Sequence, residues 1–179
     1  MKKIIAVLLL LILTVGLVAC SEDGVPQGMK DVATANAKFH LYVPESWVSQ
    51  SEGGICGATS PGGERSNVIV TNYLADQSCL DAAGYPSAAI YWANKCLPEY
   101  QATFADLVIV TDGEDTTLGG RNAKKYVYTA TLGGNSYKFM QVITADSSYV
   151  YTLTYTSLPE HYDTYVADVE NICAEFLFK

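Results

Sequence analysis

The clearest pattern in the chain is an alternation of side chains between residues 123 and 156. Large, mostly aromatic residues alternate with small or β-branched ones over 126–132 and again over 149–156, as in a half-buried strand. The alternation is interrupted by Gly133-Gly134-Asn135 and by Asp146-Ser147-Ser148, which have the composition of tight turns. The pattern predicts three sequential antiparallel strands with one large aromatic face, which we expect the last helix of the chain to cover.

Shorter strand patterns precede this region. Phe39–Val43 and a second run that begins at Trp47 are separated by a short turn, which indicates an opening hairpin. Ile55–Ser60 and Asn67–Leu74 flank a Pro- and Gly-rich stretch and indicate a second hairpin. A further strand is predicted at Leu107–Thr111.

Two segments show the periodicity of amphipathic helices. Between residues 86 and 104 the apolar positions are spaced by three and four, and because Pro98 cannot donate a backbone hydrogen bond, we expect a kink or a new helix there. These apolar positions are Ile90, Ala93, Leu97, Tyr100 and Phe104. Ser157-Leu158-Pro159-Glu160 has the sequence of a capping box, so we expect the last helix to begin there. The apolar stripe from Tyr162 to Phe176 should bury this helix against the sheet.

The N-terminus has a different pattern. Met1-Lys2-Lys3 is followed by residues 4–19, a run of sixteen in which Thr14 is the only polar side chain. A basic start and a short apolar run are typical of a signal peptide, whereas a membrane-spanning helix needs about 20 apolar residues. We therefore expect residues 1–19 to be a signal peptide.

At the end of this run, Leu17-Val18-Ala19-Cys20 resembles the bacterial lipobox. The resemblance implies that the Cys20 thiol receives a diacylglyceryl group, that the chain is cut before it, and that the mature protein is a lipoprotein. We expect such a protein to be held by its acyl chains on the extracytoplasmic face of a cell membrane. The alternative is ordinary secretion with Cys20 as a spare thiol, but an Ala-x-Ala cleavage pattern is missing.

The segment that follows Cys20 is polar and has no period of 2 or 3.6 up to residue 37. We expect residues 20–37 to be the acylated cysteine and a flexible tether, with a single folded domain over 38–179. After removal of residues 1–19, which hold Lys2 and Lys3, 160 residues remain with 9 basic and 19 acidic side chains, a net charge of −10. This balance excludes a general nucleic-acid binder and a polybasic membrane patch, because both need clustered Lys and Arg.

Within the predicted domain, Phe39-His40-Leu41-Tyr42-Val43-Pro44-Glu45-Ser46-Trp47 resembles the opening of the PsbP-like superfamily. Leu118-Gly119-Gly120-Arg121-Asn122-Ala123 and Tyr151–Thr156 are similar to its bacterial lipoprotein branch. The resemblance implies an α+β fold in which helices flank an antiparallel sheet, an α/β/α sandwich. Plant members serve photosystem assembly and Mog-type members bind a GTPase, but no catalytic residue set belongs to the superfamily.

Four cysteines remain besides Cys20: Cys56, Cys79, Cys96 and Cys173. In an oxidising compartment they allow three pairings into two disulfides. Cys79 precedes the first helix and Cys96 lies within it, so we favour a disulfide between these two. The absence of a Cys-x-x-Cys pair disfavours zinc and thioredoxin-type chemistry.

Other candidate chemistry is weak. The acidic run from Asp112 to Asp115 falls in an expected loop and could hold calcium, but its spacing is not that of an EF-hand, and a solvated acidic turn is the simpler interpretation. His40 and His161 belong to no metal or hydrolase motif, and no nucleophile elbow or phosphate-binding glycine loop occurs. We expect no cofactor, no metal and no catalysis, although a carboxylate pair that converges only in the fold would leave no local signature.

The sequence therefore favours a membrane-anchored accessory or assembly factor that binds a protein of an envelope complex. A lipoprotein that binds a small ligand or cell-wall glycan through its tyrosines is the alternative. A hydrolase whose site lacks a recognisable motif is the third hypothesis.

Overall fold

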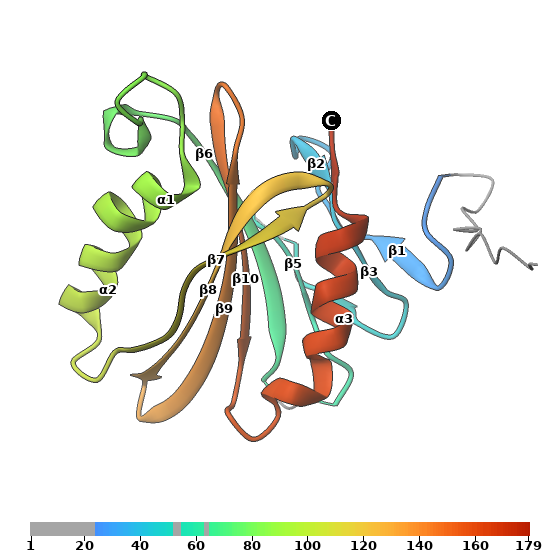
Figure 1. Ribbon diagram of the computed structural model, residues 1–179. Coiled ribbons are helices and arrows are strands. Elements are labelled where there is room, and N and C mark those ends of the chain that lie inside the picture. The colour runs from blue at the N-terminus through green and yellow to red at the C-terminus, as the bar shows by residue number, and fades with distance from the viewer. Residues whose placement is uncertain (1–23, 52–54, 63–64) are drawn as a thin grey trace, which may run out of the picture.

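The computed structural model describes residues 24–51, 55–62 and 65–179. The predicted signal peptide and Cys20 lie outside these residues. Within them, a seven-stranded antiparallel sheet separates the helices α1 and α2 on one side from α3 and a small β-layer on the other (Figure 1). The predicted α+β fold with an antiparallel sheet between helices is confirmed.

The order of strands in this sheet is β4 (Val48–Ser49), β5 (Cys56–Thr59), β6 (Asn67–Leu74), β10 (Tyr149–Ser157), β9 (Asn135–Ala145), β8 (Arg121–Leu132) and β7 (Val108–Leu118). Two small two-stranded sheets pair β1 (Met29–Asp31) with β3 (Tyr42–Pro44), and β2 (Phe39–His40) with β11 (Leu177–Phe178). The helical elements are the 3-10 turn η1 (Gln77–Cys79), α1 (Ala88–Tyr91), the π-helical turn η2 (Trp92–Cys96), α2 (Leu97–Thr103) and α3 (Tyr162–Glu175).

The three strands predicted between residues 123 and 156 are present as β8, β9 and β10. The β8–β9 turn uses Gly133 and Gly134 at φ values of 59° and 82°, a conformation that glycine adopts without steric cost and that suits a two-residue hairpin. The hairpin predicted upstream is also confirmed, since β5 and β6 pair in antiparallel register with Cys56 opposite Val70.

The predicted opening hairpin is wrong. β3 pairs with β1, and Val48 after it starts β4, which pairs with β5 in the main sheet. Trp47 lies between them and is buried, with its indole Nε1 donating to Asp168 of α3 at 3.3 Å. Trp47 is thus buried under α3 at the point where the chain passes from the small β1–β3 sheet to the main sheet. A prediction made from turn residues alone does not include this packing.

The predicted tether boundary at residue 37 is also wrong. Met29 and Val32 are buried in the core, and the Val32 amide donates to the Leu41 carbonyl oxygen at 2.9 Å. Val25 packs against the same core from a partly buried position. The fold therefore includes residues from 25 onward. The apolar side chains of Val25, Met29 and Val32 within this polar stretch pack against the core, and the segment forms the additional strand β1.

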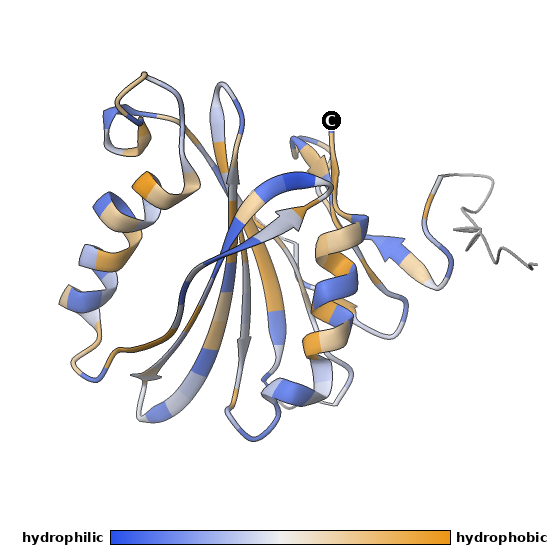
Figure 2. Ribbon diagram, in the orientation of Figure 1, coloured by the Kyte–Doolittle hydropathy of each residue, from blue (hydrophilic) through white to orange (hydrophobic). Residues whose placement is uncertain are grey.

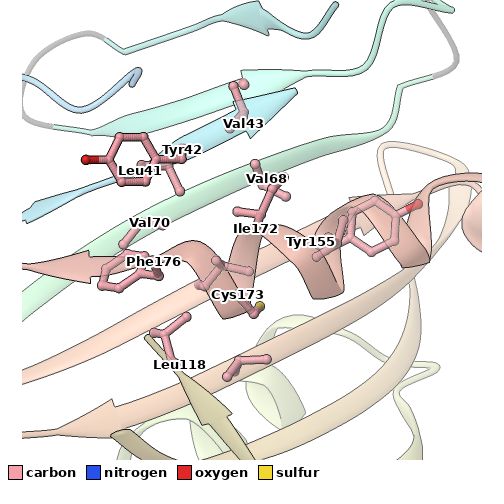
Figure 3. Packing of buried hydrophobic residues seen from close by; sticks show 14 of the residues in the cluster. Leu41, Tyr42, Val43, Val68, Val70, Leu118, Tyr155, Ile172, Cys173 and Phe176 are labelled. Atoms are coloured by element: carbon pink, nitrogen blue, oxygen red, sulfur yellow. The ribbon is translucent and has the colours of Figure 1, made fainter. Parts of the chain in front are cut away.

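The core consists of two clusters on opposite faces of the sheet. The larger cluster lies between the sheet, α3 and the β1–β3 layer, and Figure 3 shows Ile172 of α3 and Phe176, which follows this helix, beside Val68 and Val70 of β6. Polar and apolar residues alternate around α3 (Figure 2), and its buried stripe matches the prediction. The helix begins at Tyr162 rather than at a capping box, since Ser157 is the last residue of β10 and its hydroxyl bonds the Ser66 hydroxyl at 2.7 Å.

The tyrosines do not share one face, contrary to prediction. Tyr126 lies opposite Gln141, which in turn lies opposite Thr154, so Tyr126 shares a face with Thr154 and not with Tyr155. Tyr126 and Tyr128 belong to the cluster under α1 and α2, whereas Tyr155 belongs to the cluster under α3. The register between strands, which alternation within one strand cannot reveal, divides the aromatic residues between both layers.

Candidate functional site

A pocket of about 410 Å³ opens where the end of β6 meets the helices on the α1–α2 side of the sheet. One wall comes from the strand end and η1, and the other from one side of α1, η2 and α2. Its lining residues are Tyr73, Leu74, Asp76, Ser78, Cys79, Tyr91, Lys95 and Glu99. Tyrosine, leucine and alkyl surface mixed with a few charged groups is the composition of a binding site for an amphipathic molecule.

The helical wall owes its shape to Pro98. This residue lacks the N–H that would bond the carbonyl of Asn94, and its ring would clash with that carbonyl in a regular helix. The turn before it widens, so that the Leu97 amide donates to the Trp92 carbonyl, five residues earlier. The predicted new helix at Pro98 is present as α2. The predicted stripe is shifted, because Trp92 and Cys96 are buried whereas Ala93 is exposed.

Trp92 fixes this wall to the sheet. Its ring stacks on Tyr126 of β8 with centroids 4.0 Å apart and planes 13° apart. Tyr100 of α2 stacks on Tyr128 at 5.2 Å, and Tyr128 stacks on Phe139 of β9 at 4.9 Å. A continuous aromatic layer of this kind holds the helical wall at one distance from the sheet, so the pocket is preformed.

A buried polar network lies beside the aromatic layer. Gln141 Nε2 donates to the Tyr100 hydroxyl at 2.7 Å, and the Cys96 thiol hydrogen-bonds with Tyr91 and Tyr100. Burial raises the pKa of Cys96 to about 11 and that of Tyr100 to about 12, and it also raises the pKa of Tyr91 well above its usual range. These groups are therefore neutral at physiological pH, and the thiol is not a nucleophile.

The exposed rim of the pocket has different chemistry. Leu74 is 71% exposed and Tyr73 is 53% exposed, although both belong to a strand of the main sheet. The Asp76 carboxylate accepts hydrogen bonds from the hydroxyl and the amide of Ser78, which lower its pKa and keep it charged. The rim therefore combines the exposed ring of Tyr73 with the fixed charge of Asp76, and Leu74 continues the exposed strand end.

Sequence reasoning did not identify Tyr73 and Leu74 as site residues. They were assigned to a strand, which is correct, but nothing in that assignment singled them out as exposed. Both remain exposed because they lie at the end of β6, where the neighbouring β10 begins with Tyr149 opposite Leu74. Two adjacent large apolar residues at the end of a predicted strand are the signal that was available.

The residues that the sequence did single out have other roles. Among the described residues all four cysteines are free thiols, so the predicted disulfide between Cys79 and Cys96 is not present in the structure. Cys79 lines the pocket and its Sγ donates to the Asp76 carbonyl oxygen at 3.0 Å, while Cys96 lies in the same core cluster. Cys56 and Cys173 are buried on the other face of the sheet.

The acidic run at Asp112–Asp115 is not a loop. It lies within β7, where a bulge at Gly113, with φ of 78°, separates two paired segments. Glu114 pairs with Lys125 at 3.0 Å and Asp115 with Lys124 at 2.7 Å across the strands. In the part of the chain that the structure describes, no group of three or more His, Cys, Asp or Glu side chains could hold a metal ion.

The histidines are part of the structural frame. His40 Nδ1 and Asp31 Oδ2 are 2.6 Å apart, which ties β2 to β1. His161 is the N-cap residue of α3, and the capping position involves its backbone rather than a side-chain capping hydrogen bond. Neither residue lines the pocket.

A second pocket, of about 220 Å³, lies between α3 and the sheet. It contains Cys173, Lys125 and Glu170, and burial raises the pKa of the Cys173 thiol to about 12. Since Lys125 already forms an ion pair with Glu114, this pocket offers a protonated thiol beside an ion-paired lysine rather than a reactive pair.

Comparison with solved structures identifies the architecture. The cyanobacterial PsbP protein (CyanoP) of Synechocystis matches with a TM-score of 0.60 at 12% identity, over 91% of this chain and 99% of that chain. The chain has the PsbP-like fold. The same fold is found in PA94, a protein of unknown function from Pseudomonas aeruginosa, with a TM-score of 0.54 at 19% identity over 82% of this chain and 94% of that chain.

A third PsbP-like match is LpqN of Mycobacterium tuberculosis, described as involved in cell envelope biogenesis. Its TM-score is 0.52 at 16% identity, over 84% of this chain and 90% of that chain. No family model matches the sequence, and no curated protein matches it. Within the described residues of this PsbP-like domain, no helix has the length and apolar character needed to cross a membrane.

Proposed function

We propose that the chain is a lipoprotein, anchored through Cys20 on the extracytoplasmic face of a cell membrane, whose PsbP-like domain is a non-catalytic accessory or assembly factor of an envelope protein complex. The domain binds a protein partner at the pocket beside Tyr73 and Leu74. The 53% exposure of Tyr73, whose side chain lies on the pocket side of the sheet, at the mouth of a preformed pocket is the observation that carries the proposal.

The chemistry of this rim supports a protein partner. Exposed aromatic and aliphatic side chains at the edge of a pocket act as anchors in protein interfaces, because they bury apolar area at low conformational cost. Tyr73 provides such an aromatic side chain, since it lines the pocket and is 53% exposed. The fold found in LpqN, a protein involved in cell envelope biogenesis, supports the envelope as the place of action.

The size of the pocket favours a second candidate function. Sites for small organic ligands occupy roughly 300–1,000 Å³, and the pocket at Tyr73 has about 410 Å³. A lipoprotein that captures a small ligand or a cell-wall glycan unit on Tyr73 and Tyr91 would use the same walls.

Substitution of the rim tests the proposal. In full-length protein crosslinked in cells, Tyr73→Ser combined with Leu74→Ser should remove the dominant crosslinked partner. Leu132→Ser is the matched control, because Leu132 is 54% exposed at the opposite end of the sheet. An unchanged partner yield in the double variant would refute a partner at this rim, and saturable binding of muropeptides by the wild-type protein, lost in the double variant, would establish the second candidate.

Anchoring is tested separately. Cells fed an alkyne-labelled fatty acid should label the wild-type protein and not the Cys20→Ser variant, which should leave the membrane fraction or keep its unprocessed mass. Equal membrane retention and equal mass for both proteins would contradict the lipoprotein assignment.

A further inference from the structure

The start of the fold determines how far the domain can move from its anchor. Met29 and Pro26 are buried, the Met29 amide donates to the Pro26 carbonyl oxygen at 3.1 Å, and Val25 packs against the core. Glu45, which follows β3, donates its amide to the Gly28 carbonyl at 3.0 Å, so this segment is held from both sides. The chain is therefore fixed to the domain from Val25 onward.

Only four residues separate Cys20 from this fixed point: Ser21, Glu22, Asp23 and Gly24. A fully extended chain gains at most about 3.6 Å per residue, so Cys20 can lie no more than about 18 Å from Val25. The tether expected from the sequence, up to residue 37, would have reached about 60 Å.

This length is short compared with the domain. A folded chain of this size has a radius of gyration of about 15 Å and is therefore about 40 Å across. β1 and the residues before it lie at one end of the molecule, whereas α1 and α2 lie at the other (Figure 1). A linker of about 18 Å cannot pass around the domain to bring α1 and α2 to the membrane surface.

On the basis of the proposed lipid anchor at Cys20, we infer that the β1–β3 end of the domain rests against the lipid bilayer and that the pocket lined by Tyr73 and Tyr91 is presented away from it. The occupant of the β1–β3 face is the membrane surface itself. The partner of the pocket approaches from the extracytoplasmic space, and it need not be embedded in the bilayer.

Two exposed positions report this orientation. Gln27 lies within the fixed segment and Ala102 lies on α2, and both are exposed, while the four described native cysteines are buried. Full-length acylated protein with Gln27→Cys or Ala102→Cys is labelled with a fluorophore and bound to phosphatidylcholine–phosphatidylglycerol vesicles that contain a headgroup spin label. We expect quenching several-fold stronger at position 27 than at position 102.

A variant with fifteen Gly and Ser residues inserted between Gly24 and Val25 is the control, and in it the two positions should be quenched alike. Equal quenching in the acylated protein with its native linker would overturn the orientation while leaving the anchor intact. Absence of acylation or of vesicle binding, shown by mass and by flotation, would overturn the anchor and the orientation with it.

Discussion

Asp146 shows how one side chain can fix a turn of the sheet. Its Oδ1 accepts from the amides of Ser148 and Tyr149, each at 2.8 Å, and its Oδ2 accepts from Tyr151 and Arg121. Burial acts to raise the pKa of this carboxyl, but the four hydrogen bonds together outweigh it and lower the pKa below the usual range. The hydrogen bonds that close the β9–β10 turn therefore favour the charged form of this carboxyl group.

The direction of this pKa shift predicts a pH dependence. Because the pKa of Asp146 is lower in the folded state, its contribution to stability is present above its unfolded pKa, about 3.9, and is lost as pH falls through the folded value. Asp146→Asn should therefore lower the free energy of unfolding at pH 7 by about 1–2 kcal/mol, and the difference should shrink at pH 3. Urea unfolding at both pH values measures it, and a difference that does not shrink would contradict this account.

A second prediction at the scale of single residues concerns Trp92. Trp92→Ala removes the ring stacked on Tyr126 and leaves a cavity between the helical wall and the sheet, so it should lower the free energy of unfolding by about 3–5 kcal/mol. Ala93→Ser in the same π-helical turn is the control, because Ala93 is exposed and its change should stay within about 0.5 kcal/mol. Similar losses in both variants would show that the stack does not hold the wall.

At the scale of elements, the turn between β7 and β8 is a docking point for the end of α3. The Gly119 amide donates to the Cys173 carbonyl oxygen at 2.8 Å, and a Cβ on Gly119 would lie 2.2 Å from the Phe176 carbonyl oxygen. Gly120, the next residue, has the same left-handed conformation but no atom within 4 Å of such a Cβ. Substitutions at the two glycines therefore distinguish two effects. A side chain at Gly119 meets both a steric clash and an unfavourable backbone conformation, whereas a side chain at Gly120 meets only the unfavourable conformation.

A comparison of the two glycines follows from this difference. Gly120→Ala should cost about 1 kcal/mol, from the left-handed backbone alone, whereas Gly119→Ala should cost clearly more, because the end of α3 must also move. The difference between the two midpoints of urea unfolding is the measurement. Equal midpoints would mean that α3 does not depend on this turn.

Elements could be predicted from the sequence wherever one physical rule dominated. The strands β8 to β10 follow from alternation and from the turn residues between them, and α2 follows from Pro98. Pairing between elements could not be predicted in the same way, because the partners of β1 and β3 depend on burial of Trp47 and Met29 in a core that local sequence does not describe. The site was missed for the same reason, since the exposure of Tyr73 and Leu74 depends on what neighbouring elements leave uncovered.

At the scale of the whole molecule, the two sides of the sheet differ in what they contain. The α3 side contains the larger core and the segment that leads toward Cys20, and the α1–α2 side contains the pocket with its exposed rim. Under the proposed function, one end of the domain serves for attachment and the other for binding. The excess of acidic residues makes a partner surface with basic and apolar groups the best complement to the rim.

Site-specific photocrosslinking in cells tests the central claim most directly. A photoreactive amino acid is placed at Tyr73 or at Leu132 of the full-length, anchored protein, two exposed positions at opposite ends of the sheet. We predict one discrete protein adduct from position 73 that is missing from position 132. The same products from both positions, or none from position 73, would contradict a partner at this pocket.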